Sequence, residues 1–516
     1  MVYLTTAIDY PNGSPHIGHA YEKVLTDVLA RYHRLKGDEV YFLTGVDQHG
    51  QKMVQTAEKE GVNVATLAKK NTKKFIKLLD TLDISNDGWV ETTDERHKAC
   101  VAKILNDLHE KGQLYKKSYQ GFYSVRQEQF LTDKERDAEG NFGEEWGEVV
   151  ELEEENWYFK LTEHVEWLKG AIEAGTIPIF PEFRKSEVLN ALKGAENDLC
   201  ISRPKERLAW GIPLPFDPEF VTYVWFDALI NYISFAGYLA GDDSDLPDFS
   251  KLWPAKWHVI GKDIMVPAHA VYWPCMLHAM GFTDEQMPGL LVHGWWNVRG
   301  EKMSKSTGNF IDPNELCDKL GSDAVRYYLA RDIVTGKDSD FDPTRVVLLF
   351  NTELANGLGN LLNRSLNMTK GSLGSVLCEF AYDDEDCQKV RDSHANLLVT
   401  YRNKMDALDP RGALEAVVSF VTDVNAFTDR TEPWQLKKDE TKRDQLAAVL
   451  YHLCESCAQV SVLLSPFVPE ASAKMQTQLK ADLSGLKLND LSWGLLKPGH
   501  ETGKNKPVFP RLEPLD

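Results

Sequence analysis

The sequence lacks the marks of secreted and membrane-spanning proteins. It contains no run of about eighteen apolar residues, so no transmembrane helix is predicted. The amino terminus has no basic segment followed by an apolar run, so no signal peptide is expected. Internal repeats and low-complexity tracts are also missing. These absences predict a cytoplasmic globular protein with no membrane partner.

Cysteine is scarce, with eight residues scattered over a chain of 516. This usage favours free thiols in a reducing compartment over a disulfide framework. Only Cys454 and Cys457 form a CxxC pair, on a stretch that reads as a buried helix. A structural zinc site normally needs four ligands and no second pair follows, so a core role is favoured over a metal or redox role.

Positive charge is also in short supply. The chain has 58 Lys and Arg against 78 Asp and Glu, for a net charge of −20. Taken alone, this argues against nucleic-acid binding, because phosphate contacts dominate such affinity. The acidic residues gather in 133–155 and around 383–386, which leaves room for a basic face elsewhere.

The chain is too long for one core, and its patterning divides it. Predicted strands alternate with long helices both before and after an insertion, and the carboxyl-terminal part of the chain is predicted to be almost wholly helical. The predicted fold class is α/β: a Rossmann-like parallel sheet split by a connective insert, then an all-α helix bundle. The expected regions are the first half of a nucleotide-binding domain (1–115), the insert (116–215), the second half of that domain (216–296), a lysine-rich loop region (297–345) and the bundle (346–516).

The stretch near the amino terminus predicts an anion site. Residues 2–5 read as a buried strand, and Ser14 and Pro15 are typical of a helix N-cap and first turn. His16 and His19 then share one face of the helix start, beside free N–H groups and the positive end of the helix dipole. The alternative is a pair of surface histidines.

Two further segments join this site. Asp47 follows a strand predicted at 40–45, and ligands bind at the carboxyl ends of parallel strands. Lys302 and Lys305 flank a Met-Ser pair in a loop that would place two ammonium groups on a polyphosphate. The alternative for this loop is ordinary solvated surface.

These segments resemble the paired signatures of class I aminoacyl-tRNA synthetases. The signatures are His16-Ile17-Gly18-His19 and Lys302-Met303-Ser304-Lys305-Ser306. The likeness to the methionyl-tRNA synthetase branch covers essentially the whole chain, including 7–13, 45–50, 223–228, 260–264, 309–311, 432–434 and 507–511.

The resemblance implies ATP-dependent activation of L-methionine to methionyl-adenylate, with Mg²⁺, and transfer to the 3′-terminal adenosine of initiator and elongator tRNA(Met). Its implied catalytic residues are His16, His19, Lys302, Lys305 and Arg203. ATP would also contact Gly18 and Gly294. The implied methionine site comprises Ile8, Tyr10, Asp47, Trp225, Ala228, Leu229, Tyr232, Ile264, His269 and Trp273, and the implied anticodon site Asn360, Arg364 and Trp434.

Structural alternatives exist for several of these residues. Arg203 could form an ion pair within the insert, and Trp434 could be packed in a core, because Trp is often buried. The pocket aromatics could likewise be ordinary core residues.

The sequence departs from the family pattern in two places. The segment from Asp263 to His269 is one residue longer than usual, which puts the register of Ile264 in doubt. Ser124 and Gln127 stand where many members carry a zinc-binding CxxC. Since zinc needs thiolate or imidazole ligands, we predict a knuckle without zinc and no bound structural metal.

Two rival functions stay open. The first is a synthetase for leucine, valine or cysteine; the insert is short for the editing domain of the first two, and no zinc thiolate lies near Tyr10 for the third. The second is a catalytically idle tRNA-binding protein, which the complete signatures disfavour. No appended dimerisation domain follows Arg511, so a monomer is expected.

Overall fold

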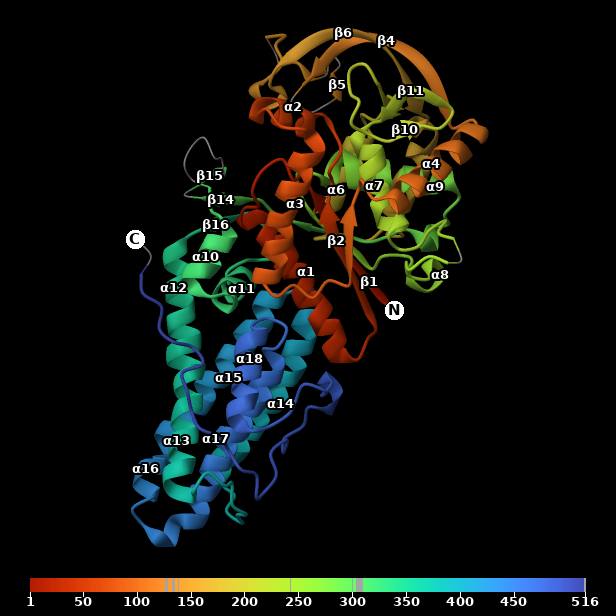
Figure 1. Cartoon of the computed structure of the whole chain (residues 1–516). Helices are drawn as coiled ribbons and strands as arrows, with labels where there is room; N and C mark the ends of the chain where they lie inside the picture. Colours follow the sequence, from red (N-terminus) through yellow and green to blue (C-terminus); the bar gives the residue numbers. More distant parts are fainter. Residues whose placement is uncertain are drawn as a thin grey trace.

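The computed structural model describes residues 1–125, 129–131, 135–137, 139–241, 243–298, 300–302 and 310–514. An α/β part carries the N-terminus, and a helical part lies below it in Figure 1. The α/β part is built on a parallel sheet, and the helical part is a bundle. The predicted fold class is confirmed.

The central sheet has six parallel strands in the order β3-β2-β1-β12-β13-β7. Their bounds are β1 Val2–Asp9, β2 Val40–Val46, β3 Gly88–Glu91, β7 Ile179–Phe180, β12 Trp257–Gly261 and β13 Leu290–His293. The first strand is longer than the sequence predicts, because it continues beyond Thr5 to Asp9. Strand β7 pairs with β13, although it lies within the range expected for the insert.

Alternate residues of each central strand face two different cores. Leu4, Phe42 and Val259 belong to the core shared with the bundle. Tyr3, Leu43 and Ile260 belong to the core on the opposite face. Because both faces are covered, the strands read as continuous apolar runs, as is typical of parallel sheets.

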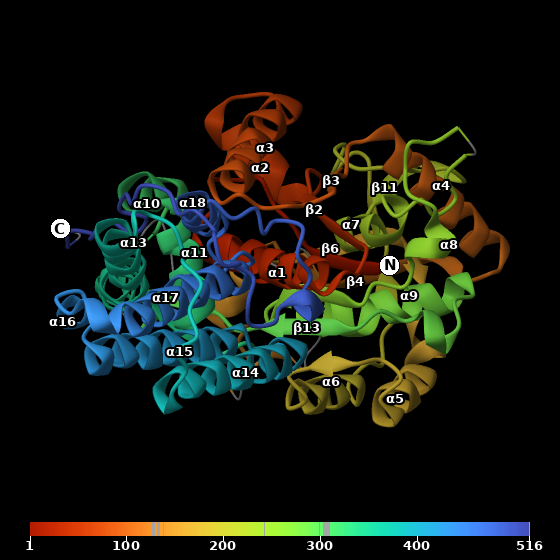
Figure 2. The ribbon, with the colours of Figure 1, turned by 90° about the horizontal axis from the view of Figure 1, so that it is seen from below.

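Helices cover both faces of this sheet. Helix α1 (Ile17–Lys36) packs between the sheet and the bundle, as the view from below in Figure 2 shows. The other helices of the α/β part are α2 Gln51–Glu60, α3 Val64–Thr81, α4 Glu95–Glu110, α7 Val224–Ser234, α8 Phe249–Leu252 and α9 Trp273–Met280.

The described part of the insert contains two small antiparallel sheets and two α-helices. Their elements are β4 Leu114–Ser124, β5 Gln129–Leu131, β6 Val149–Phe159, β8 Leu199–Cys200, β9 Ser202–Pro204, β10 Pro213–Leu214, β11 Asp217–Thr222, α5 Val165–Ala174 and α6 Arg184–Leu192. The long β4–β6 pair arches over the top of the molecule in Figure 1.

A third small sheet leads to the bundle. It orders β15 (Glu301–Lys302), β14 (Trp296–Val298) and β16 (Ser339–Phe341), with α10 Pro313–Leu320 and α11 Ser322–Arg331 beside it.

The bundle begins with one continuous rod made of α12 (Pro343–Leu349), a π-helical stretch (Phe350–Gly359) and α13 (Asn360–Leu373). The remaining helices are α14 Glu385–Asp406, α15 Pro410–Thr431, α16 Pro433–Leu436, α17 Arg443–Leu463 and α18 Pro469–Leu479. Asp384 caps α14 by accepting from the Cys387 N–H, and Glu385 and Asp386 lie in the first turn of that helix.

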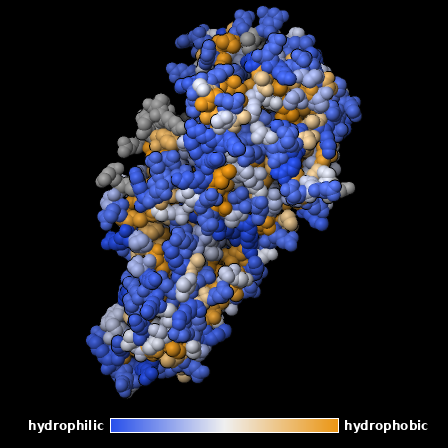
Figure 3. Space-filling model, viewed as in Figure 1, coloured by the Kyte–Doolittle hydropathy of each residue, from blue (hydrophilic) through white to orange (hydrophobic). Residues whose placement is uncertain are grey.

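Helix α17 is the core of the bundle. With its preceding turn it is long and apolar enough to cross a membrane, but its apolar window is entirely buried among the other helices. Cys454 and Cys457 are fully buried on it, and burial raises the pKa of Cys454 to about 12. Both thiols are therefore packing residues. The face of the molecule in Figure 3 is largely hydrophilic, with small, separate apolar areas.

Candidate active site

A cavity of about 590 Å³ lies at the carboxyl ends of the central strands. Residues that precede the insert and residues that follow it line the same cavity, so the two halves of the split domain form one site. The sequence-predicted residues on its wall are Ile8, Tyr10, His16, Gly18, His19, Asp47, Trp225, Ala228, Leu229, Tyr232, Ile264, His269 and Gly294.

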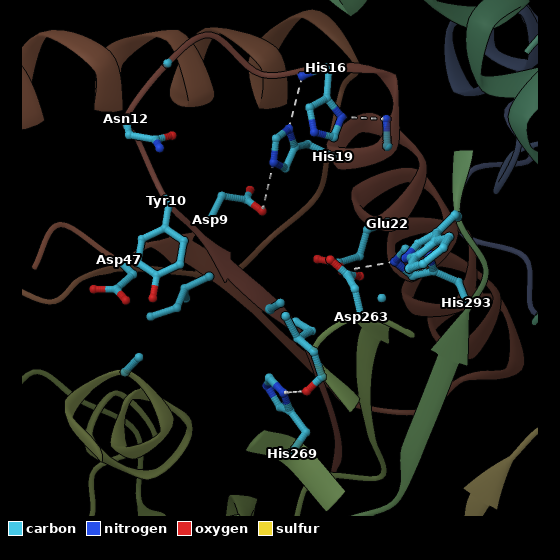
Figure 4. A pocket seen from close by; sticks show the side chains of 18 of the residues that line it. Asp9, Tyr10, Asn12, His16, His19, Glu22, Asp47, Asp263, His269 and His293 are labelled. Atoms are coloured by element: carbon cyan, nitrogen blue, oxygen red, sulfur yellow. Dashed lines mark hydrogen bonds and ion pairs between the residues drawn. The ribbon is translucent and has the colours of Figure 1, made fainter. Parts of the chain in front are cut away.

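The two histidines themselves begin helix α1. His16 is the N-cap: its Nδ1 accepts from the Gly18 N–H at 3.1 Å, and its own N–H donates to His19 Nδ1 at 3.0 Å (Figure 4). The expectation that Ser14 caps the helix is wrong, because the paired imidazoles satisfy the free N–H groups two residues later. A Cβ on Gly18 would approach the His16 ring to 2.9 Å, which explains the glycine.

This capping fixes how the imidazoles can donate. Since both Nδ1 atoms accept backbone protons, each neutral ring carries its own proton on Nε2. Burial, together with nearby Lys23, lowers the pKa of His19 to about 3. Two stacked rings, 3.8 Å apart, thus present neutral N–H donors at the cavity wall.

A buried charge cluster that sequence reasoning missed lies behind the histidines. Lys23 Nζ is 2.8 Å from Glu22 Oε1, 3.0 Å from Asp9 Oδ2 and 3.0 Å from the Ala7 carbonyl. Glu22 Oε2 lies 3.1 Å from His293 Nε2. The available signal was the charged Glu22-Lys23 pair within an otherwise apolar stretch of helix. We call Asp9, Glu22, Lys23 and His293 the pocket cluster.

The members of the pocket cluster differ in proton affinity. Burial raises the pKa of Asp9 to about 6, more than Lys23 lowers it. Burial also raises that of Glu22, but Lys23 and His293 outweigh it and bring the value to about 2. Asp9 and Glu22 both line the cavity, as do Asp263 and His293.

Asp47 lies beside Tyr10, on the side of the cavity away from Glu22 and His293 (Figure 4). Its Oδ1 accepts from the His49 N–H and from the Thr92 hydroxyl, each at 3.2 Å. Its own N–H donates to the Asp9 carbonyl at 2.9 Å, which ties the end of β2 to the end of β1. The carboxylate is buried and held in place, as a partner for a ligand cation should be.

The apolar end of the cavity is organised by His269. Its Nδ1 donates to the Ile264 carbonyl at 2.8 Å, so its Nε2 accepts from the Tyr232 hydroxyl at 2.7 Å. Burial lowers the pKa of His269 to about 4, so the ring is neutral. A π-helical segment, Met265–Tyr272, carries this turn. Such wider turns accommodate one extra residue, and both Ile264 and His269 reach the wall.

Trp273 does not line this cavity. It is fully buried, and its Nε1 donates to His258 Nε2 at 3.1 Å. The His258 ring in turn stacks on Tyr232 with centroids 4.1 Å apart. Trp273 therefore supports Tyr232 from behind.

Arg203 is likewise outside the main cavity. It lines a second cavity of about 350 Å³. The π-helical segment lines both cavities, and Tyr223, the residue before α7, lines the second one. Its guanidinium lies 4.6 Å from the Tyr223 ring centroid and donates to the Ser202 carbonyl at 2.7 Å.

The lysine loop is described only at its start. Lys302 ends β15 opposite Asn297, and Lys305 lies outside the described residues. Gly294 lies on the cavity wall, where a Cβ would come within 2.2 Å of the Lys337 carbonyl oxygen.

Of the expected anticodon residues, Arg364 on α13 and Trp434 on α16 meet at the far end of the bundle, and Asn360 begins α13 (Figure 1). The Arg364 guanidinium lies 5.4 Å from the Trp434 ring centroid, and Asn360 is exposed. Trp434 is 39% exposed, so it is not a core residue.

The expected zinc-less knuckle is only partly described. Ser124 donates to the Trp146 carbonyl at 2.5 Å, and Gln127 lies outside the described residues. Among the residues that are described, no three His, Cys, Asp or Glu side chains gather as metal ligands.

Comparisons with known proteins agree with this geometry. The family described as "tRNA synthetases class I (M)" matches residues 2–142 and 145–366, and the "Anticodon binding domain of methionyl tRNA ligase" matches 381–513. A methionine--tRNA ligase of Rhizobium meliloti is 40% identical over 99% of this chain and 98% of its own. A methionine--tRNA ligase of Brucella melitensis is 39% identical over 100% of this chain and 98% of its own.

Solved structures give the same result. Mycobacterium tuberculosis methionyl-tRNA synthetase in complex with methionyl-adenylate is 37% identical, with a TM-score of 0.92 over 99% of both chains. The apo form of the same enzyme has a TM-score of 0.86 and is 34% identical, over 100% of this chain and 98% of that chain. The chain therefore belongs to the methionyl-tRNA synthetases, a family of class I aminoacyl-tRNA synthetases.

Proposed function

We propose that this protein joins L-methionine to tRNA(Met) in two steps, through methionyl-adenylate. The observation that carries this proposal is the single cavity whose wall combines Nε2–H donors from His16 and His19 with the Asp47 carboxylate and an apolar end at His269. An anion, an ammonium group and an apolar side chain would thus be held side by side.

The substrates bring their own nucleophiles. The methionine carboxylate attacks the ATP α-phosphate and pyrophosphate leaves; the terminal ribose hydroxyl of tRNA then attacks the adenylate carbonyl and releases AMP. The protein's contribution is to position the reactants and to stabilise charge. A neutral imidazole suits this task, because its N–H can bond a phosphate oxygen without giving up its proton.

The histidines and lysines are proposed to act on the phosphates. His16 and His19 would donate from Nε2, while Lys302 and Lys305 would neutralise the departing pyrophosphate. Removing one such donor should cost about 10²–10³-fold in rate. Arg203 is proposed to act on the reacting carboxylate from the second cavity, across the shared wall.

Methionine is proposed to bind with its ammonium on Asp47 and its thioether among Tyr10, Trp225 and His269. Sulfur–aromatic contacts favour this slot by about 0.3–1.5 kcal/mol each. Ile8, Ala228, Leu229, Tyr232 and Ile264 would complete it, with Trp273 as support.

The tRNA is proposed to be read at the other end of the molecule. Trp434 would stack on an anticodon base, and Asn360 and Arg364 would bond base edges, as single-stranded RNA is commonly read. The exposure of Trp434 and its contact with Arg364 support this role.

The remaining properties are also proposals. Mg²⁺ would accompany the ATP phosphates, which supply the oxygen ligands it prefers, and we assign it no protein ligand. The insert would hold no zinc, which elemental analysis finding about one zinc per chain would overturn. A cytoplasmic monomer serving initiator and elongator tRNA is expected.

Amino-acid-dependent ATP–pyrophosphate exchange tests the proposal. Exchange with methionine alone is expected, with weak activity toward close analogues, because one methylene is worth only about 1–3 kcal/mol. Exchange with leucine, valine or cysteine instead would identify another synthetase. No exchange with any amino acid would leave only the idle tRNA-binding protein.

A further inference from the structure

A buried carboxylate outside the cavity wall joins three elements of the α/β part. Asp227, on α7, is fully buried and receives two imidazoles. His49 Nδ1 donates to its Oδ2 at 2.6 Å, and His97 Nε2, on α4, donates to its Oδ1 at 2.7 Å. Ser234 Oγ lies 2.8 Å from the other nitrogen of His97. We call Asp227, His49 and His97 the carboxylate bridge.

The carboxylate bridge links two walls of the cavity. Helix α7 supplies Trp225, Ala228, Leu229 and Tyr232 to one wall. His49 lies two residues after Asp47 on the other wall, and its backbone N–H donates to Asp47 Oδ1. The same residue thus bonds Asp227 with its ring and Asp47 with its main chain.

The bridge is strong because both of its hydrogen bonds are charge-assisted and fully buried. Burial alone would raise the pKa of Asp227, but His49 and His97 outweigh it and lower the value to about 2. The carboxylate is therefore ionised at neutral pH. A neutral amide in its place accepts at only one atom and turns an N–H group toward one imidazole donor.

We propose that Asp227 is a positioning residue for the amino acid substrate. Acting through His49, it holds the Asp47 carboxylate at a fixed distance from the α7 wall, so that the ammonium and the side chain of one ligand fit together. This inference rests on the proposed function, because the ligand is an α-amino acid with an apolar side chain. A displacement of about 1 Å in such a site costs up to about 10²-fold.

Asp227→Asn tests the inference in methionine-dependent ATP–pyrophosphate exchange. The KM for methionine should rise about tenfold or more, while the KM for ATP stays within about twofold. A merely structural role would lower the amount of active enzyme without separating the two constants. The matched control is Ser234→Ala, which leaves both bonds to Asp227 in place; its KM values should stay within about twofold of the parent.

A second pair of variants covers the case in which Asp227→Asn does not fold. His49→Asn retains a side-chain donor near the position of Nδ1, whereas His49→Ala does not. Asn should preserve more of the methionine affinity than Ala. Equal loss in both variants, or a parallel rise in both KM values for Asp227→Asn, would overturn the inference.

Direct binding separates this inference from the proposed function. Calorimetry would compare L-methionine with its analogue that lacks the α-amino group. The parent protein should prefer methionine, and the preference should shrink about tenfold in Asp227→Asn. An unchanged preference contradicts the inference even if exchange is normal, and a parent that binds methionine without exchange contradicts only the catalytic proposal.

Discussion

Helix α1 carries two buried charge clusters that differ in how completely they are satisfied. The first is the pocket cluster, around Glu22 and Lys23. The second, one turn further on, is Asp27 with Arg31, Ser85 and Arg326, which we call the junction cluster. The pocket cluster borders a cavity, whereas Asp27 and Arg326 are 0% exposed.

In the junction cluster both oxygens of the buried Asp27 carboxylate are occupied by partners from the protein itself. Asp27 accepts from the Ser85 N–H and hydroxyl and from both arginines. Arg326 also donates to three carbonyls: Leu82 at 2.8 Å, Pro466 at 2.8 Å and Phe467 at 2.9 Å. It thereby fastens the turn between α17 and α18 to helix α1, which begins at the candidate active site. A saturated cluster joins domains, and an open one is available to a substrate.

The largest effect is expected from breaking the junction cluster with Arg326→Met. The variant removes one of the two arginines paired with the buried Asp27 carboxylate and leaves three carbonyls without their donor, which should cost about 3–5 kcal/mol of unfolding free energy. Urea unfolding followed by circular dichroism measures it. Asp27→Asn combined with Arg326→Met should cost less than the sum of the single changes. A loss below about 1 kcal/mol would mean that the junction is not held by this pair.

The next effect concerns the pocket cluster. Glu22→Gln takes one negative charge from Lys23 and His293 at the cavity wall, and should slow pyrophosphate exchange by about 10²-fold through misplacement. Because the glutamine keeps one oxygen acceptor beside Lys23 at the cavity wall, the urea midpoint should fall by less than in Arg326→Met. A fall in stability comparable to that of Arg326→Met would erase the distinction between the two clusters.

Two carboxylates, Asp9 of the pocket cluster and Asp27 of the junction cluster, should respond oppositely to pH. The pKa of Asp9 is raised to about 6, so its stabilising contribution is complete below the unfolded value near 3.8 and is lost as pH rises through 6. The pKa of Asp27 is lowered, because Arg326 and Arg31 outweigh burial, so its contribution is lost only as pH falls below 3.8.

Asp9→Asn isolates the contribution of Asp9 to the slope of unfolding free energy against pH. Between pH 4 and 7 it should remove a stability change of about 1–3 kcal/mol. Thermal unfolding at several pH values measures it, with Asp27→Asn as the control that leaves this slope in place. An identical slope in Asp9→Asn and the parent would contradict the assignment.

The smallest effect is expected at the edge of the junction cluster. Arg31 is partly exposed, and Asp27 keeps Arg326 and Ser85 without it. Arg31→Ala should therefore cost less than about 1 kcal/mol in the same urea experiment, as partly exposed ion pairs commonly do. A cost near that of Arg326→Met would show that the cluster extends to the surface.

Local sequence patterns predicted the parts of the site that depend on neighbouring residues. The strand before the histidines, the helix after them and the position of Asp47 at a strand end follow from periodicity and from the geometry of parallel sheets. The N-cap was wrong because Ser14-Pro15 is a common capping pattern, and nothing local shows that two imidazoles will cap each other.

Contacts between distant segments could not be read in this way. Glu22 meets His293 across 271 positions, and Asp227 meets His49 across 178. Trp273 was expected on the cavity wall but stands behind Tyr232. The face of a helix that lines a cavity depends on how side chains from distant segments pack in the two hydrophobic cores. The sequence of one segment does not determine that packing.

The sequence by itself determined the alternation of strands and helices, the insert, the bundle and the residue types at the candidate active site, because these are set by local periodicity and short motifs. Only the tertiary structure decided which buried charges meet and which of them stay open to a ligand. Burial and pairing set the ionisation of Asp9, His19 and Asp227, and both arise only when segments far apart in the chain pack together.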